Sequence, residues 1–249
     1  MERRFLLVFD MKNYNNIVSL GFFCGIAQEL ERIGLRNCSY PLDWVISDFL
    51  SVLNLIENHF YDFLNIKYLK KDKSEQEQKD NYVVINTKYN IKFSHDFKKK
   101  YEIEEQLKEI KQKYKRRIDR LYTNISDRPT LFIRYIKNEE EYTYIYNHAD
   151  IIISLLKSYN NKNNIIYIYN DDLLEINQSN NFYKVKKDKN DTVNRKCFKS
   201  NKKLKKFILE NVNYKKGKRF LQICKYKKKY IKWRINDKLF WGLIVKYEI

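Results

Sequence analysis

The sequence from Ser19 to Trp44, SLGFFCGIAQELERIGLRNCSYPLDW, contains the pattern that decides the fold of this chain. The apolar residues just before it and at its start (17–20) predict a buried strand that ends at Gly21. Residues 24–33 then predict a helix, and Gly34 occupies the position of its C-terminal cap. The apolar stripe of this helix consists of Phe23, Ile26, Ala27, Leu30 and Ile33.

Cys24 lies at the predicted start of this helix. It falls off the apolar stripe, on the face shared with Gln28 and Glu31, which argues against a core-packing role. The unpaired N–H groups and the dipole at a helix N-terminus favour a thiolate over a neutral thiol. Cys24 is therefore a candidate nucleophile.

The remaining pattern alternates helices and strands. Apolar periodicity predicts helices over residues 48–59, 102–122, 142–158 and 202–209, and strands over 82–85, 89–93, 131–136, 165–169, 182–185 and 219–224. The order strand–helix–strand from residue 131 onward favours parallel pairing, whereas the hairpin at 82–93 adds antiparallel pairing. We therefore expect an α/β fold with a mixed sheet flanked by helices. The polar, charge-mixed residues 70–80 predict an exposed loop.

The net charge of +19 is concentrated near the C-terminus. Residues 181–234 contain 21 lysines and arginines against Asp188, Asp191 and Glu210, a local net charge of +18 (21 minus 3), so the rest of the chain is close to neutral. This division predicts an α/β catalytic domain over residues 1–180 and a basic C-terminal region over 181–249 that packs on the same domain.

Several classes of protein are disfavoured by composition. The apolar runs at 5–9 and 239–245 are too short for a membrane span or a secretory signal, so we expect a cytoplasmic protein without a transmembrane segment. The four cysteines (Cys24, Cys38, Cys197 and Cys224) have no CxxC spacing and no paired histidines. We therefore expect neither a zinc site nor disulfides, and no cofactor.

A thiol nucleophile needs a base, and His95 is the best candidate among the three histidines. It follows a predicted strand, in a predicted loop, and strand ends are where α/β proteins usually build sites. Asp96 is the first choice to orient the imidazole and Asp43 the alternative. Backbone N–H groups near Phe23, Cys24 and Gly25 are candidates for an oxyanion hole.

Five residues are candidates for substrate binding: Gly21, Phe23, Asp43, Trp44 and Arg134. Each also has a structural interpretation. Asp43 and Trp44 fit a turn that buries the indole, and Arg134 in its predicted strand fits an ion pair with an acidic neighbour. His59 and His148 fit packing or surface positions, and Arg116, Arg117 and Arg120 fit a solvated helix face.

The run SLGFFCGIAQELERIGLRNCSYPLDWVIS, residues 19–47, resembles the opening of a bacterial family described as papain-like cysteine peptidases. The match consists of Ser19, Leu20, Gly21, Cys24, Leu30, Arg32, Leu35, Arg36, Pro41, Asp43 and Trp44. Leu42 stands where the family usually has phenylalanine. FSHDF (93–97), RRIDRL (116–121) and LFIRY (131–135) are similar to later blocks, so the resemblance covers about residues 17–170. It implies Cys24 as nucleophile and His95 as base, and a papain-like α+β fold as the alternative architecture.

Three functional hypotheses follow. The first is a papain-like peptidase, or another thiol-dependent hydrolase or acyl-transfer enzyme, that acts on a peptide or acyl substrate. The second is a surface-polysaccharide-related transferase or glycan-binding protein, because members of the resembled family are commonly associated with such genes. The third is a binder of nucleic acid or an anionic surface, because residues 225–234 (KYKKKYIKWR) interleave charge with aromatic rings. A solvated lysine-rich surface is the simpler interpretation of that region.

Overall fold

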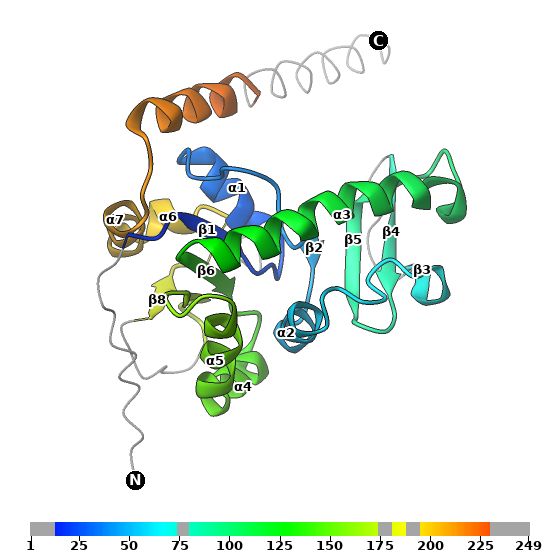
Figure 1. Cartoon of the computed structure of the whole chain (residues 1–249), viewed down its shortest axis with the longest axis horizontal. Coiled ribbons are helices and arrows are strands. Elements are labelled where there is room, and N and C mark those ends of the chain that lie inside the picture. Colours follow the sequence, from blue (N-terminus) through cyan, green and yellow to red (C-terminus); the bar gives the residue numbers. More distant parts are fainter. Residues whose placement is uncertain (1–12, 74–79, 174–180, 188–194, 230–249) are drawn as a thin grey trace, which may run out of the picture.

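The computed structural model describes residues 13–73, 80–173, 181–187 and 195–229 (Figure 1). The apolar runs at 5–9 and 239–245, most of the predicted loop at 70–80, and residues 230–234 of the basic aromatic stretch lie outside the described residues. The strands are β1 (Asn16–Ser19), β2 (Val45–Ile46), β3 (Leu69–Lys71), β4 (Asn81–Asn86), β5 (Ile91–Lys98), β6 (Thr130–Tyr135), β7 (Asn164–Asn170) and β8 (Phe182–Val185). The helices are α1 (Gly25–Arg32), α2 (Phe49–Glu57), the 3-10 helix η1 (Ile66–Tyr68), α3 (Ile103–Asp127), α4 (Glu139–Asn147), α5 (Ala149–Tyr159), α6 (Cys197–Ser200) and α7 (Lys202–Asn211), and a further helix covers residues 216–229.

The strands form two sheets of different kinds. One is entirely parallel, in the order β1–β6–β7–β8, and the other is entirely antiparallel, in the order β2–β5–β4–β3. The predicted α/β class, with parallel and antiparallel pairing flanked by helices, is confirmed. The two kinds of pairing are divided between separate sheets because the segment between β1 and β6 forms its own antiparallel unit.

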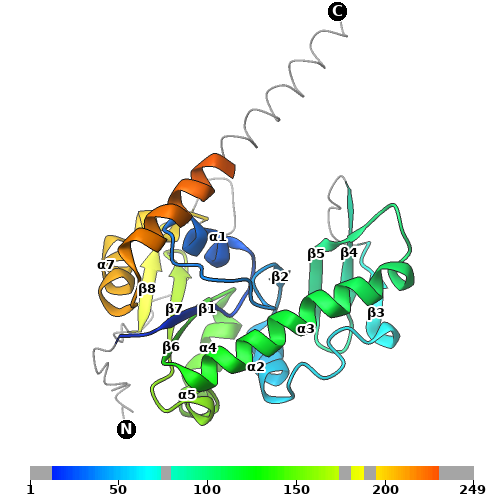
Figure 2. The same cartoon turned by 45° about the horizontal axis from the view of Figure 1, so that its top comes forward.

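The parallel sheet is buried on both faces. Every residue of β6 is buried, and alternate residues face opposite sides: Leu131 and Ile133 contact one apolar cluster and Phe132 the other. Helices α1, α6 and α7 pack against the first face, and α2, α3 and α5 against the second (Figure 2). Strands covered by helices on both faces read as continuous apolar runs, which is the pattern of these segments.

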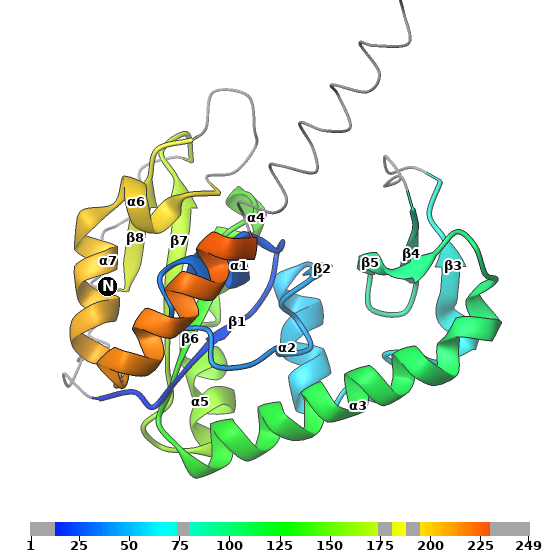
Figure 3. The same cartoon turned by 90° about the horizontal axis from the view of Figure 1, so that it is seen from above.

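Helix α3 joins the two sheets. It is 25 residues long and begins with a capping box between Glu102 and Glu105. Its first half buries Leu107 and Tyr114 in the same cluster as Phe93 of the antiparallel sheet, and its last turns bury Ile125 near the parallel sheet. Figure 3 shows α3 running beneath both sheets. The length of this helix therefore fixes how far apart the two sheets lie.

Three predicted elements differ from the structure. Residues 219–224, predicted as a strand, lie within the helix over 216–229. The helix predicted over 142–158 is divided into α4 and α5, which meet at His148. The strand predicted to end at Phe93 continues as β5 to Lys98, so His95 lies within a strand and not in a loop.

The described part of the basic region packs on the parallel sheet. β8 pairs with β7, and Cys197, Phe198, Leu204 and Ile208 of α6 and α7 are buried in the apolar cluster that covers the β1 side. Within the described residues, no helix has both the length and the apolar character that a membrane crossing requires.

Candidate active site

Cys24 is positioned by a tight connection between β1 and α1. β1 ends at Ser19, Gly21 adopts a φ of +78° and Phe22 a φ of +59°, and α1 begins at Gly25 with Cys24 as its N-cap. Two consecutive residues with positive φ turn the chain sharply, and glycine adopts such a φ without steric cost. The thiol therefore lies at the carboxyl end of a parallel strand, where α/β proteins usually build their sites.

The Cys24 thiol is only partly buried and has a cationic neighbour. One terminal nitrogen of the Arg195 guanidinium lies 3.9 Å from Cys24 Sγ. The same guanidinium carbon lies 5.5 Å from the centroid of the Phe23 ring. A nearby cation and a helix N-terminus both favour the thiolate form of a cysteine. Arg195 lies 171 residues from Cys24 in sequence, so sequence reasoning had no signal for it.

Arg134 anchors the loop that carries Cys24. Its side chain is completely buried and forms a two-bond ion pair with Glu141, at 2.8 Å from Nε and 2.6 Å from Nη2. The remaining donors reach the carbonyl of Leu20 at 3.0 Å, and the hydroxyl and carbonyl of Ser47 at 3.2 and 2.8 Å. This geometry corresponds to the alternative interpretation of Arg134, an ion pair with an acidic neighbour, because its donors are used inside the protein.

Ser47 lies at the centre of the same arrangement. Its hydroxyl accepts a hydrogen bond from the Phe22 N–H at 3.3 Å, and its own N–H donates to the Phe22 carbonyl at 3.2 Å. A Cβ at Gly21 would lie 2.6 Å from Ser47 Oγ, so the loop can approach this closely only with glycine. The structure thus brings Gly21 and Arg134 together at Ser47, and Glu141 pairs with the same guanidinium. The sequence motif did not single out Ser47 or Glu141.

His95 lies in an irregular part of β5. Val84 pairs with Phe93 and Tyr82 with Phe97, so two steps along β4 correspond to four along β5. The extra residues form a bulge around His95, and bulges re-aim side chains out of the regular alternation. His95 is exposed, although Phe93 and Phe97 on either side are fully buried.

Trp44 is an aromatic neighbour of His95. Their ring centroids are 6.0 Å apart and the rings are nearly perpendicular. Trp44 also has a cationic neighbour, because the Arg36 guanidinium carbon lies 5.2 Å from the Trp44 ring centroid. Trp44 is partly buried and directly precedes β2, which pairs with β5. The structure therefore brings together the PLDW and FSHDF motifs.

The two candidate orienting carboxylates have other partners. Asp96 accepts hydrogen bonds from Lys113 Nζ and from the Tyr114 hydroxyl on α3, the latter at 2.8 Å. Asp43 is 2% exposed and accepts bonds from Arg36, at 3.1 and 2.7 Å, and from the Tyr40 N–H at 2.9 Å. The hydrogen bonds of Asp96 to α3 and of Asp43 to Arg36 and Tyr40 thus use both carboxylates in contacts that hold the surrounding elements.

Burial raises the pKa of the Asp43 carboxyl above its ordinary value, and the Arg36 guanidinium opposes this shift. Asp43 thus holds Arg36, and Arg36 in turn covers Trp44. The Arg36–Asp43 pair fixes the conformation of the motif, a role that fits the structural interpretation of PLDW as a turn.

Cys24 and His95 belong to different sheets. Cys24 follows β1 of the parallel sheet, and His95 lies in β5 of the antiparallel sheet. The segment from Trp44 to Ser47 lies between the loop that carries Cys24 and the strand that carries His95. Ser47 bonds to Phe22 at one end, and Trp44 contacts His95 at the other.

Phe23, a predicted substrate-binding residue, is 8% exposed. Its ring packs edge-on against Tyr135, with 5.3 Å between the ring centroids.

The other cysteines and histidines have different environments. Cys197 is buried and its thiol pKa is raised by burial. His59 lies 4.7 Å from the Tyr122 ring between centroids, and the His148 ring stacks on Tyr144. No three His, Cys, Asp or Glu side chains gather as a metal site within residues 13–73, 80–173, 181–187 and 195–229.

Together the fold and the site define an α/β protein with a partly exposed thiol at the amino end of a helix. Residues 15–169 match the model of a family described as "Putative papain-like cysteine peptidase (DUF1796)", and the chain belongs to this family. The chain is also 30% identical, over 178 residues, to "Uncharacterized protein R408" of Acanthamoeba polyphaga mimivirus; the match covers 64% of this chain and 80% of that protein. That relative is viral, so the expectation of a bacterial family has no support here. No solved structure matches the chain.

Proposed function

We propose that this protein is a thiol-dependent hydrolase that cleaves peptide bonds, with Cys24 as the nucleophile. The observation that carries the proposal is the placement of a partly exposed thiol at the first turn of α1, beside the Arg195 guanidinium. The family description points to the same chemistry. A thiolate attacks an amide carbon more readily than a serine hydroxyl does, and both surroundings favour the thiolate.

The proposed reaction has two steps. In the first, His95 takes the proton of the Cys24 thiol, Sγ forms a bond to the carbonyl carbon of the substrate, and the C–N bond breaks as His95 passes that proton to the nitrogen. In the second, a water molecule gives a proton to His95 and its oxygen attacks the thioester carbon. The C–S bond then breaks, which releases the acid, and His95 returns the proton to Sγ. The N–H groups at Phe23, Cys24 and Gly25 are the candidate donors to the oxygen of the tetrahedral intermediate.

In this proposal Trp44 positions the His95 ring. Asp96 and Asp43, the orienting acids expected from the sequence, are held by Tyr114 and Arg36. The Trp44 and His95 rings are nearly perpendicular, and the Arg36 guanidinium lies over the indole. Trp44 is therefore a positioning residue for His95.

Gly21 and Arg134 act indirectly in this scheme. Both are buried and hold the loop that carries Cys24, so neither offers an atom to a substrate. The glycan-binding alternative requires Gly21, Asp43, Trp44 and Arg134 to line a pocket. Because all but Trp44 are buried in internal contacts, that alternative receives less support than the thiol hydrolase.

The test uses the full chain and a mixed library of peptide–aminomethylcoumarin amides. Cys24→Ser and His95→Asn are each expected to lower kcat/KM by about 10³-fold or more, because nucleophile and base act as one unit. Cys38→Ser and His148→Asn are the matched controls and are expected to keep full activity. Trp44→Phe should lower kcat and shift its pH profile while leaving KM nearly unchanged. Full turnover by Cys24→Ser would exclude the proposed nucleophile.

A further inference from the structure

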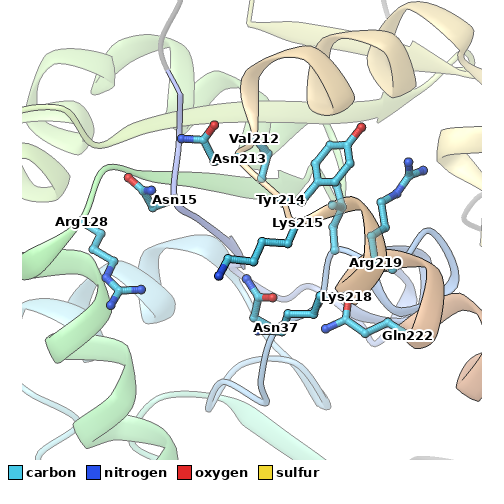
Figure 4. Close-up of a pocket in the computed structure, with 12 residues that line it drawn as sticks. Asn15, Asn37, Arg128, Val212, Asn213, Tyr214, Lys215, Lys218, Arg219 and Gln222 are labelled. Carbon is cyan, nitrogen blue, oxygen red and sulfur yellow. The ribbon is translucent and has the colours of Figure 1, made fainter.

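A cavity lies at the edge of the parallel sheet opposite to Cys24. Its volume is about 370 Å³, and its walls come from segments far apart in sequence. Asn15 directly precedes β1 and Arg128 lies two residues before β6, so the cavity opens at the amino ends of these strands. The opposite wall is formed by the segment that follows α7 and by the helix over residues 216–229 (Figure 4).

The lining of this cavity is strongly cationic. Arg128, Lys215, Lys218 and Arg219 contribute four positive charges, and the lining includes no aspartate or glutamate. Figure 4 shows Lys215 extending between the side of Arg128 and the wall that carries Lys218. Among the described residues, Arg128, Lys215 and Lys218 form no ion pair. Unneutralised like charges around one hollow repel each other, and a bound anion relieves that repulsion.

One wall of the cavity is held in place by packing. Arg219 Nε donates a hydrogen bond to the Ile33 carbonyl at 2.9 Å, and its guanidinium carbon lies 4.9 Å from the Tyr214 ring centroid. A Cβ at Gly34, where φ is +75°, would lie 2.6 Å from the Arg219 carbonyl oxygen. Gly34 therefore allows the basic helix to approach the end of α1 closely. The fold thus holds Arg219 in its place in this wall.

The remaining lining groups are polar and neutral. Asn15, Asn37, Asn213 and Gln222 add amide donors and acceptors around the cations. An arginine fork and lysine ammonium groups suit a phosphate, while amides suit hydroxyl groups. A cavity of this volume is larger than a bare phosphate needs and lies at the lower end of the range for small-molecule sites.

We propose that this cavity binds a small phosphate ester whose body carries hydroxyl groups. The phosphate lies among Arg128, Lys215 and Lys218, and the hydroxyl-bearing body contacts the asparagine amides. The volume of about 370 Å³ fits a small ligand, and Tyr214 is the one aromatic residue of the lining, whereas a nucleic acid strand is usually held by several rings on which its bases stack. This inference does not depend on the proposed hydrolase activity, since the cavity and Cys24 lie at opposite strand ends.

The test is isothermal titration calorimetry of the full chain with ribose 5-phosphate in low-salt buffer. We expect binding to one site, weakened by added NaCl, and no binding of ribose. The pair Arg128→Gln/Lys215→Gln should weaken binding by about tenfold or more, because each charge-assisted contact is strong. The pair Lys203→Gln/Lys205→Gln removes the same charge from exposed positions of α7 and should leave the affinity unchanged.

Three outcomes would overturn the proposal. The first is the absence of ribose 5-phosphate binding, and the second is an equal loss of affinity in the two double variants, which would indicate a general effect of net charge. The third concerns a fluorescent ten-nucleotide single-stranded DNA. If this strand bound through Arg128 and Lys215 and ribose 5-phosphate did not displace it, the cavity would belong to a nucleic acid site instead.

Discussion

Arg134 of β6 and Glu141 of α4 form a two-bond ion pair inside the protein, and the same guanidinium donates a 3.0 Å hydrogen bond to the Leu20 carbonyl. The ion pair links β6, the strand whose Arg134 bonds to the Cys24 loop, to helix α4. Because a buried charge without its partner is costly, the loop and the helix are held together by more than apolar packing. Four of the predictions below concern this loop and its surroundings.

Removal of one member of the pair should destabilise the protein strongly. Glu141→Gln is expected to lower the free energy of unfolding by about 3–5 kcal/mol, because Arg134 would remain buried without a counter-charge. Glu140→Gln on the same helix is the control, because the Glu140 side chain is exposed. This substitution should change the free energy of unfolding by less than about 0.5 kcal/mol. Urea denaturation measures both. Equal stabilities of the two variants would contradict the role assigned to the ion pair.

Gly21→Ala should also destabilise the protein. The positive φ alone costs about 1–2 kcal/mol for alanine, and the contact with Ser47 Oγ adds to this cost. Gly217→Ala is the matched control: it lies in a helix with no atom near the new Cβ, so it should be neutral or stabilising by up to about 1 kcal/mol. Thermal unfolding of both variants tests the expectation, which would fail if Gly21→Ala melted at the wild-type temperature.

Iodoacetamide at neutral pH should label Cys24 faster than the other three cysteines. Cys197 should react slowest, because burial raises its thiol pKa and leaves little thiolate at that pH. Arg195→Gln should slow the labelling of Cys24, whereas Lys199→Gln, which removes a charge from the exposed part of α6, should not. Peptide mass spectrometry gives the four rates. Equal rates at all four sites would count against an activated Cys24.

The buried Asp43 carboxyl should make stability depend on pH. Because its folded-state pKa is raised, the folded protein holds this proton more tightly than the unfolded chain does. The stabilisation that the protonated Asp43 carboxyl gives the folded state is therefore fully present at low pH. It is lost as pH rises from about 4 through the raised pKa. The free energy of unfolding of the wild type minus that of Asp43→Asn should decrease between pH 4 and pH 7. An increase over this interval would show that the Arg36 charge, and not burial, dominates.

Much of the local structure was predictable because it depends on short stretches of sequence. The strand before Gly21 and the helix after Cys24 with its glycine cap both follow from apolar periodicity and backbone chemistry. The alternation of strands and helices after residue 130 likewise indicated parallel pairing. Residues 219–224 were wrongly predicted as a strand, because apolar residues flanked by lysines do not distinguish a strand from one face of a helix.

The candidate site depended more on tertiary structure. The motif singled out Cys24, but the contacts of Arg195 with Cys24 and of Ser47 with Phe22, and the ion pair of Glu141 with Arg134, have no local signal in the sequence. His95 was predicted in a loop, and the structure places it in a strand bulge, which only the register between β4 and β5 reveals. Asp96, its neighbour in sequence, contacts Tyr114 of α3, because the bulge takes this part of β5 out of the regular alternation of side chains.

The sequence by itself determined the α/β class, the placement of a thiol at a helix start and the concentration of positive charge near the C-terminus, since each is a property of neighbouring residues. Only the tertiary structure decided that the two kinds of pairing form separate sheets and that Arg134 is an internal anchor. It also gathered Arg128, Lys215 and Lys218 around one cavity. The physical reason is that burial, ion pairing and cavity walls are made by residues far apart in the chain, and folding alone brings these together.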